Sequence, residues 1–216
     1  MSVVRSFERR LERLLEGVTG RVFSGRLHPS EIAGRLAREA DFARFEHETG
    51  PATANLYTIL VNPRDLTTDP GDLAASLAAE LDRHTAEAGL RLEGPCQVVI
   101  TTSDQVSPGA LICHVEVSPG ALVVWARLVS VGGTHDVGRN RAVIGRSGAA
   151  DVTLPHDEVS RRHAVLWREG GRAWVRDLGS ANGTVADGAQ VGDDPTEIGT
   201  GSVIVFAGHR YRFNVT

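Results

Sequence analysis

The sequence predicts a two-domain protein, with an N-terminal α+β domain over residues 1–118 and a C-terminal antiparallel β-sandwich over residues 121–216. The chain has 216 residues, enough for two small domains that each bury a core. Apolar residues follow helical spacing in much of the first half. After Gly120, short apolar segments recur about every ten residues between Gly, Asp and Asn turns, which is typical of a sandwich. The Ser-Pro-Gly at residues 118–120 therefore marks the predicted boundary.

The first half is predicted to fold in the order helix, helix, strand, helix, strand, strand (ααβαββ). The first helix covers residues 4–17, because Phe7 and the leucines after it repeat on one helical face. The second begins near Pro29, which suits a first helical turn, and a polar loop over residues 47–54 follows it. The third carries leucines four residues apart and ends at Gly89. The strands are expected over residues 55–61, 96–101 and 110–117.

The second half is predicted to contain only strands and turns, because no helical period is sustained there. Trp167 and Trp174 flank a Glu-Gly-Gly turn and are expected to pair across it. The predicted strands cover residues 121–130, 134–137, 141–145, 151–154, 163–168, 172–177, 184–186, 196–198, 202–206 and 210–215.

The charge distribution argues against a broad nucleic-acid surface. All 23 basic residues are Arg, and 27 acidic residues give a formal net charge of −4. Residues 1–120 carry 12 Arg against 17 acidic residues, a net charge of −5, and residues 121–216 carry 11 against 10, a net charge of +1. The acidic first half disfavours nucleic acid, whereas the second half leaves room for a local anion site.

Membrane insertion and secretion are not expected from the sequence. No apolar run reaches the roughly 18 residues of a membrane span, and the first residues lack the apolar core of a signal peptide. We therefore expect a cytoplasmic protein. Cys96 and Cys113 are too few for a disulfide framework or a metal cluster, and they lie in apolar segments. They are expected to pack as small apolar side chains, and no cofactor is expected.

Polar side chains that suit an anion occur at fixed intervals in the second half. Arg146 follows a predicted strand, Ser160 and Arg161 lie in a later loop, and Asn182 lies in a third. Alone, each has an ordinary explanation: a solvated arginine, a loop cap and a type I′ hairpin turn at Asn182-Gly183. Loops at one end of a sandwich would gather them. Two guanidiniums, a hydroxyl and an amide then form a donor set for a phosphate on a peptide.

Three neighbouring residues are expected to support these loops rather than to contact a ligand. Gly145 permits close backbone approach beside the arginine, and Gly183 permits a tight turn. His163 begins an apolar strand, and its ring nitrogens can tie the Ser160 loop to nearby backbone. Because the sequence has no nucleophile elbow around Ser160, no P-loop and no dinucleotide fingerprint, we do not expect an enzyme.

The joint spacing GR-x13-SRRH-x18-NGT, inside an all-β segment, closely resembles that of the forkhead-associated (FHA) domain. Members of that family are β-sandwiches that bind phosphothreonine peptides, and the resemblance covers about residues 121–216. The implied roles are phosphate contact by Arg146, Ser160 and Arg161, peptide-backbone contact by Asn182, and loop architecture for Gly145, His163 and Gly183.

The first half, with its segments SFERRLERLLEG and YTILVNP, resembles the N-terminal domain of unknown function that precedes FHA domains in actinobacterial proteins. This resemblance covers about residues 4–118. Such proteins belong to Ser/Thr-kinase signalling around cell-wall synthesis and division. The resemblance implies a non-enzymatic adaptor whose partner is a phosphothreonine-containing kinase, pseudokinase or kinase substrate. It allows recruitment to membrane-bound partners, with no membrane insertion and no nucleic acid.

Two other interpretations stay open. An FHA fold could serve as a scaffold that oligomerises without phosphate. The segment Gly17-Val18-Thr19-Gly20 matches the GxxG clamp of KH RNA-binding domains, and residues 1–44 carry nine Arg against six acidic residues. The residues between the two glycines are not basic, however, and helix termination explains both glycines. The phosphothreonine adaptor is therefore the favoured hypothesis.

Overall fold

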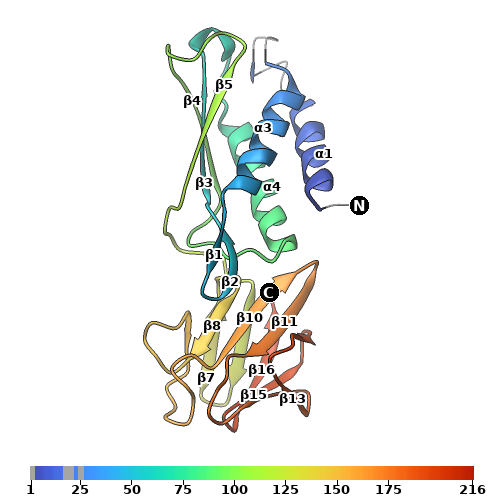
Figure 1. Ribbon diagram of the computed structural model, residues 1–216, viewed down its shortest axis with the longest axis vertical. Helices are drawn as coiled ribbons and strands as arrows, with labels where there is room; N and C mark the ends of the chain where they lie inside the picture. Colours follow the sequence, from blue (N-terminus) through green and yellow to red (C-terminus); the bar gives the residue numbers. More distant parts are fainter. Residues whose placement is uncertain (1–2, 17–21, 24–26) are drawn as a thin grey trace. The chain divides into compact units, whose positions relative to one another are not determined.

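The structure, a computed structural model, describes residues 3–16, 22–23 and 27–216 and contains two compact units (Figure 1). Helices lie in unit 1, and unit 2 is built on antiparallel sheets, so the predicted fold class is confirmed. Two short segments of the first half pack with the second half. Unit 1 consists of Met1–Phe45, Ala52–Thr85 and Leu92–Gly120, and unit 2 of Glu46–Pro51, Ala86–Arg91 and Ala121–Thr216.

Unit 1 packs helices on one side of a three-stranded sheet (Figure 1). Its elements are α1 (Val3–Glu16), α3 (Pro29–Phe42), β3 (Leu56–Val61), the 3-10 turn η1 (Pro63–Asp65), α4 (Gly71–Glu87), β4 (Gln97–Thr102) and β5 (Leu111–Glu116). The sheet order is β4-β3-β5, with β3 parallel to β4 and antiparallel to β5. The parallel pair is possible because α4 carries the chain back from the end of β3 to the start of β4.

The predicted helical faces form the core of unit 1. Phe7, Leu11 and Leu15 of α1 are at most 1% exposed, and Leu77 and Leu81 of α4 are fully buried. Alternate residues of β3 are buried as well, as expected for a strand with one face against helices. The Gly17–Gly20 segment of the KH hypothesis lies outside the described residues.

The predicted polar loop over residues 47–54 is wrong, because this segment belongs to a hairpin of β1 (Arg44–His47) and β2 (Gly50–Thr53). At its tip, the Thr49 N–H donates to His47 Nδ1 over 3.2 Å, and Thr49 is fully buried. Gly50 adopts a φ of +115°, which favours glycine. The segment is polar and lacks alternation, so periodicity could not predict these strands.

Unit 2 is a sandwich of a five-stranded sheet, in the order β14-β11-β10-β8-β9, and a six-stranded sheet, in the order β13-β12-β15-β16-β6-β7. The pairs are antiparallel except for β8 with β9. Buried apolar residues such as Ile144, Leu166 and Phe213 form one core cluster. The strands are β6 (Ala126–Ser130), β7 (Gly133–Val137), β8 (Ala142–Gly145), β9 (Val152–Thr153), β10 (Ala164–Glu169), β11 (Arg172–Asp177), β12 (Thr184–Ala186), β13 (Ala189–Val191), β14 (Thr196–Ile198), β15 (Val203–Phe206) and β16 (His209–Val215).

All ten strands predicted for the second half are present, although the first begins only at Ala126, and β13 was missed. The pairing of Trp167 with Trp174 is confirmed, with ring centroids 6.5 Å apart. Strand β13 follows a two-residue turn at Asp187-Gly188, where both residues have positive φ. An Asp-Gly pair is a strong hairpin signal, so this strand could have been predicted from the sequence.

The type I′ hairpin considered for Asn182-Gly183 is wrong. Gly183 has a φ of +74°, but Asn182 is not among the residues with positive φ, and a type I′ turn needs both. The segment connects β11 of one sheet to β12 of the other, so it crosses the sandwich edge instead of reversing within a sheet.

Both cysteines are free, Cys113 buried and Cys96 partly buried. Burial raises the pKa of Cys96 to about 12 and that of Cys113 to about 11, so both thiols are protonated near neutral pH. Among the described helices, none has the length and apolar character needed to span a membrane.

Candidate functional site

A pocket of about 660 Å³ lies in unit 2 between the end of β8 and the loop that precedes β10. This volume is in the range of ligand-binding pockets. The predicted residues Arg146, Ser160 and Arg161 line it together. Asn182 does not, and it lies exposed on the loop between β11 and β12. The complete lining is Glu48, Val143, Arg146, Ser147, Ala149, Ala150, Ser160, Arg161 and Arg162.

Gly145 brings two sides of the pocket together. A Cβ at this position would lie 2.2 Å from the carbonyl oxygen of Arg161, so only glycine lets the end of β8 approach that peptide. The Arg146 N–H donates to the Ser160 carbonyl over 3.0 Å as a result. The side chains of Arg146 and Arg161 therefore project from two backbone segments that are directly bonded to each other.

The Ser160 hydroxyl is held with its proton available. Its oxygen accepts a hydrogen bond of 3.0 Å from the Ala181 N–H, and no donation by this hydroxyl occurs among the described residues. A hydroxyl has one donor and two acceptor positions. Because the contact with Ala181 uses an acceptor position, the O–H can still donate to an anion in the pocket.

Asn182 braces a neighbouring loop with one of its amide hydrogens. Its Nδ2 donates to the carbonyl oxygen of Glu158 over 2.8 Å, which ties the 178–183 loop to the segment leading to Ser160. The amide also has a second N–H and a carbonyl oxygen. Since Asn182 is exposed, these groups are accessible to the backbone of an extended peptide.

His163 is fully buried and connects the Ser160 loop with the 178–183 loop. The Ser160 N–H donates to Nδ1 over 3.2 Å, so Nδ1 must be unprotonated and Nε2 must carry the hydrogen of the neutral ring. Nε2 then donates to the Gly183 carbonyl over 3.1 Å. Burial lowers the pKa of His163, although the bond to Gly183 and the nearby Asp177 act in the opposite direction. The neutral ring therefore makes one hydrogen bond to each of the two loops.

A second buried cluster supports the 178–183 loop, and the sequence interpretation missed it. Asp177 accepts bonds of 2.7 Å from the N–H and the hydroxyl of Ser180 and one of 2.6 Å from the Thr184 hydroxyl. Burial raises the pKa of Asp177, but these donors outweigh that effect and hold it below its usual value. An Asp three residues before a Ser is a local turn signal that could have revealed this contact.

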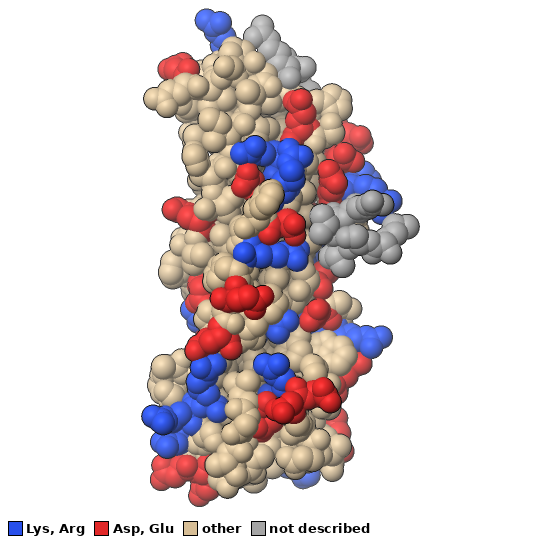
Figure 2. Space-filling model, viewed as in Figure 1, with Lys and Arg blue, Asp and Glu red and all other residues tan. Residues whose placement is uncertain are grey.

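The pocket carries uncompensated positive charge. Neither Arg146 nor Arg161 has an ion pair among the residues that the structure describes, whereas Arg162 pairs with Glu48. Among the described residues on the face shown in Figure 2, basic and acidic side chains are interspersed, without an extended basic stripe. A local concentration of guanidiniums suits a compact anion better than a nucleic-acid backbone.

Two family models match the sequence. The model described as "FhaA, N-terminal domain" matches residues 4–114, which is just over half of the chain, and the model described as "FHA domain" matches residues 142–207. The chain belongs to the FhaA N-terminal domain family. It is an FHA-domain protein with an FhaA-type N-terminal domain, and both resemblances predicted from the sequence are confirmed.

The chain is also similar to individual proteins. The FHA domain-containing protein FhaB of Mycolicibacterium smegmatis is 42% identical over 55 residues, which span 26% of this chain and only 36% of that protein. A chain from a structural and functional analysis of phosphothreonine-dependent FHA domain interactions is 30% identical, with a TM-score of 0.38, and the match covers 43% of this chain and 96% of that chain. The FhaA FHA domain complexed with the intracellular domain of Rv3910 is 30% identical, with a TM-score of 0.37, and the match covers 43% of this chain and 100% of that chain.

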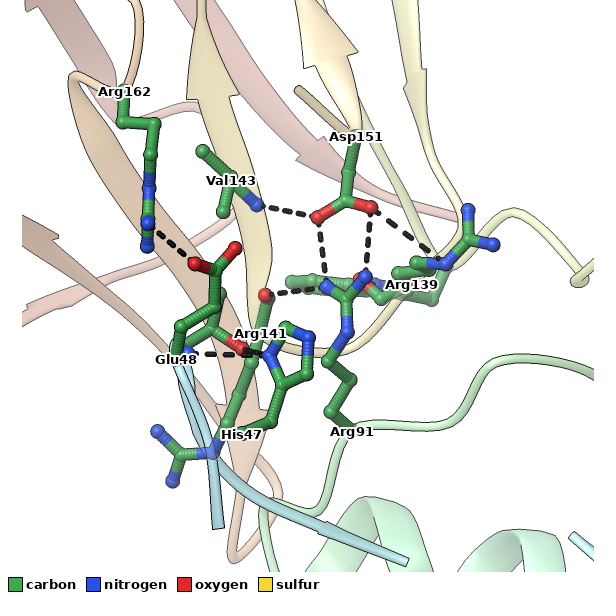
Figure 3. Close-up of polar contacts among 10 residues, drawn as sticks. His47, Glu48, Arg91, Arg139, Arg141, Val143, Asp151 and Arg162 are labelled. Atoms are coloured by element: carbon green, nitrogen blue, oxygen red, sulfur yellow. Dashed lines mark hydrogen bonds and ion pairs between the residues drawn. The ribbon is translucent and has the colours of Figure 1, made fainter. Parts of the chain in front are cut away.

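Two segments within the FhaA-type range, 46–51 and 86–91, belong to the same compact unit as the FHA domain. Figure 3 shows one contact of these segments: Arg91 donates two hydrogen bonds to the Asp151 carboxylate, of 2.7 and 3.0 Å. Asp151 also accepts the Val143 N–H over 2.8 Å. The two charged side chains are only 7% and 12% exposed. Burial raises the pKa of Asp151, but the hydrogen bonds from Arg91 and Val143 have the larger effect, so the pKa lies below its usual value.

The Arg91–Asp151 pair lies next to the pocket, because Ala149, Ala150 and Val143 all line it. Sequence reasoning missed both this pair and Glu48. The two members of the buried pair are 60 residues apart in the chain. No periodicity or local motif links residues at such a separation, so the sequence offers no signal for the contact.

Proposed function

We propose that this protein is a non-enzymatic adaptor that binds phosphothreonine-containing proteins through the pocket of unit 2. The observation that carries the proposal is the pair of guanidiniums, Arg146 and Arg161, beside a Ser160 hydroxyl whose proton is available. Neither arginine has an ion pair among the described residues. A phosphothreonine carries a charge of about −1.5 to −2 at neutral pH and three acceptor oxygens, which complement this donor set.

Each residue has a defined role in the proposed complex. Arg146 and Arg161 donate charge-assisted hydrogen bonds to the phosphate, and Ser160 donates its hydroxyl proton to a third oxygen. Asn182 contacts the backbone of the peptide. Gly145, His163 and Gly183 support the loops that carry these groups.

We also propose a division of labour between a domain over residues 1–118 and an FHA domain over residues 121–216. The FHA domain binds a phosphothreonine on a kinase, pseudokinase or kinase substrate. The N-terminal domain makes a second protein contact. We further propose that the adaptor acts in the cytoplasm, in Ser/Thr-kinase signalling that serves cell-wall synthesis or division, where its partners can include membrane-bound proteins.

The experiment is a calorimetric titration of the full chain with peptides that have a fixed central phosphothreonine and with the same peptides lacking phosphate. Each charge-assisted bond is worth about 1.5–3 kcal/mol. Arg146→Ala or Arg161→Ala should therefore weaken binding by about ten- to a hundredfold. Arg172→Ala is the matched control, because Arg172 lies on β11, is exposed, and pairs with Glu197 outside the pocket.

Equal binding of the phosphorylated and unphosphorylated peptides would contradict the proposal. A loss in Arg172→Ala as large as that in Arg146→Ala would contradict the assignment of the site.

A further inference from the structure

Glu48 places a carboxylate in a pocket whose other charged residues are three arginines. Its Oε2 accepts a hydrogen bond of 2.6 Å from Arg162 Nη1 (Figure 3). The side chain of Glu48 is 59% exposed and that of Arg162 is 44% exposed. A carboxylate repels a phosphate, so phosphate binding alone does not account for an acidic residue at this position.

The hairpin tip that carries Glu48 is packed firmly within unit 2. The neighbouring Thr49 is fully buried. A Cβ on Gly50 would lie 2.9 Å from a guanidinium nitrogen of Arg141, so this backbone rests directly on that side chain. Arg141 is itself fixed, because it donates to the Gly89 carbonyl and lies 5.1 Å above the Trp167 ring. The backbone of Glu48 is therefore held at the pocket by contacts that need no ligand.

The charges of the lining divide into two parts. Arg146 and Arg161 match the charge of one phosphate, while Glu48 neutralises Arg162. A cationic side chain that lies beside the phosphothreonine of a ligand could share the exposed Glu48 carboxylate with Arg162. An acidic side chain at the same place would meet a like charge, which is the repulsive element that specificity requires.

We propose that Glu48 is a specificity residue that selects phosphothreonine ligands with Arg or Lys next to the phosphothreonine and disfavours Asp or Glu there. The proposal rests on the proposed function of the pocket. It assigns ligand recognition to a residue from the range of the FhaA-type N-terminal domain, so the ligand site extends beyond the FHA domain.

The effect should be modest, because exposed ion pairs contribute about 0.2–1 kcal/mol, which corresponds to a preference of about 1.5- to fivefold. It should also shrink as salt rises. The probe is a peptide library with a fixed central phosphothreonine and mixed flanking residues, selected on the full chain and sequenced. Glu48→Gln removes the charge with little change of shape, and Glu48→Arg reverses it. Glu197→Gln is the matched control, because Glu197 makes a similarly exposed ion pair with Arg172 of β11, outside the pocket.

We expect the wild type and Glu197→Gln to enrich Arg and Lys at one or two flanking positions. Glu48→Gln should lose this enrichment, and Glu48→Arg should favour Asp and Glu at the same positions. The same flanking preference in the wild type and in Glu48→Gln would overturn the inference and leave the proposed function standing. A uniform gain of affinity in Glu48→Gln, without a change of preference, would also overturn it. Failure of the wild type to distinguish the phosphothreonine library from its unphosphorylated twin would overturn both.

Discussion

The two units use polar side chains in different ways. In unit 1, Asn55 is fully buried and donates to the carbonyl oxygens of Pro95 and Ser118 while accepting the Ser118 N–H. These bonds join loops and leave little of the amide for a ligand. In unit 2, Ser160 and Asn182 each use only part of their hydrogen-bonding capacity, and Ser160 lines the same pocket as two arginines that have no ion pair among the described residues.

The extent to which a polar side chain is hydrogen-bonded within the protein distinguishes residues that stabilise the fold from residues of a binding site. A polar group whose bonds are all made within the protein stabilises the fold, whereas one that is held in place but incompletely bonded is prepared for a partner. In unit 2 the fully bonded groups, His163 and Asp177, lie beneath the loops, and the incompletely bonded groups lie at the surface. The comparison predicts that changes to the first kind alter stability, and changes to the second kind alter ligand binding.

The two units can be followed separately in unfolding experiments. All three tryptophans, Trp125, Trp167 and Trp174, lie in unit 2, so their fluorescence reports on that unit. The described α-helices belong almost entirely to unit 1, so the helical circular dichroism signal reports on unit 1.

The largest effect is expected from Asp151→Asn. This substitution breaks the buried ion pair between Arg91 and Asp151, and breaking such a pair by removing one charge costs about 3–5 kcal/mol. Urea unfolding followed by tryptophan fluorescence should show the loss. Asp136→Asn is the control, since Asp136 pairs with Arg127 at the surface, and it should cost less than about 1 kcal/mol. Equal losses in the two variants would contradict the structural role of the buried pair.

Asn55→Ala tests the architectural side of the comparison. It leaves the backbone groups of Pro95 and Ser118 without their buried partner. We expect the free energy of unfolding of unit 1, measured through the helical circular dichroism signal, to fall by about 2–3 kcal/mol. Phosphopeptide affinity, measured by calorimetry on the folded variant, should not change. A clear drop in affinity would contradict the claim that Asn55 stabilises the fold without contributing to ligand binding.

Gly145→Ala should affect both stability and binding. Its Cβ would meet the Arg161 carbonyl at 2.2 Å, so the end of β8 and the 160–161 peptide must separate. We expect a loss of about 1–3 kcal/mol in unit 2, together with weaker phosphopeptide binding. Gly148→Ala is the control, because nothing lies within 4 Å of its Cβ position. Unchanged binding in a folded Gly145→Ala variant would contradict the need for this close approach.

The smallest effect is a dependence of stability on pH. The pKa of His163 is lower in the folded chain than in the unfolded chain, so the unfolded chain takes up its proton first as the pH falls. The stability contributed by the neutral ring is therefore full above about pH 6.5 and decreases below it. Urea unfolding followed by tryptophan fluorescence, measured about every half pH unit between about pH 7.5 and pH 5, should show the free energy of unfolding of the wild type falling with pH. His163→Gln should be less stable at pH 7 and should lose part of the slope; an unchanged slope would contradict the role of His163.

Sequence reasoning predicted the parts of the molecule that depend on local patterns. The helical face from Phe7 to Leu15 and the Trp167–Trp174 pair follow from periodicity and turn chemistry. Of the four residues predicted to contact a ligand, Arg146, Ser160 and Arg161 line one pocket, whereas Asn182 lies outside its lining. Such features are set by residues that are close in sequence or by loops at one end of a sandwich.

Sequence reasoning failed where distant polar residues meet. Arg162 and Glu48 are 114 residues apart, and their contact depends on a hairpin that has no alternating pattern. A carboxylate or guanidinium on its own indicates a solvated surface in most sequences. Only the folded chain shows that the segments 46–51 and 86–91 pack in the unit that carries the pocket.

The most direct test of the central claim is a calorimetric cycle that combines Arg146→Ala with removal of the phosphate from the peptide. The four affinities give the coupling free energy between the guanidinium and the phosphate. We predict a coupling of about 1.5–3 kcal/mol for Arg146 and a value close to zero for the control Arg172→Ala. A coupling close to zero for Arg146, with both peptides still bound, would contradict the assignment of this pocket as the phosphate-binding site.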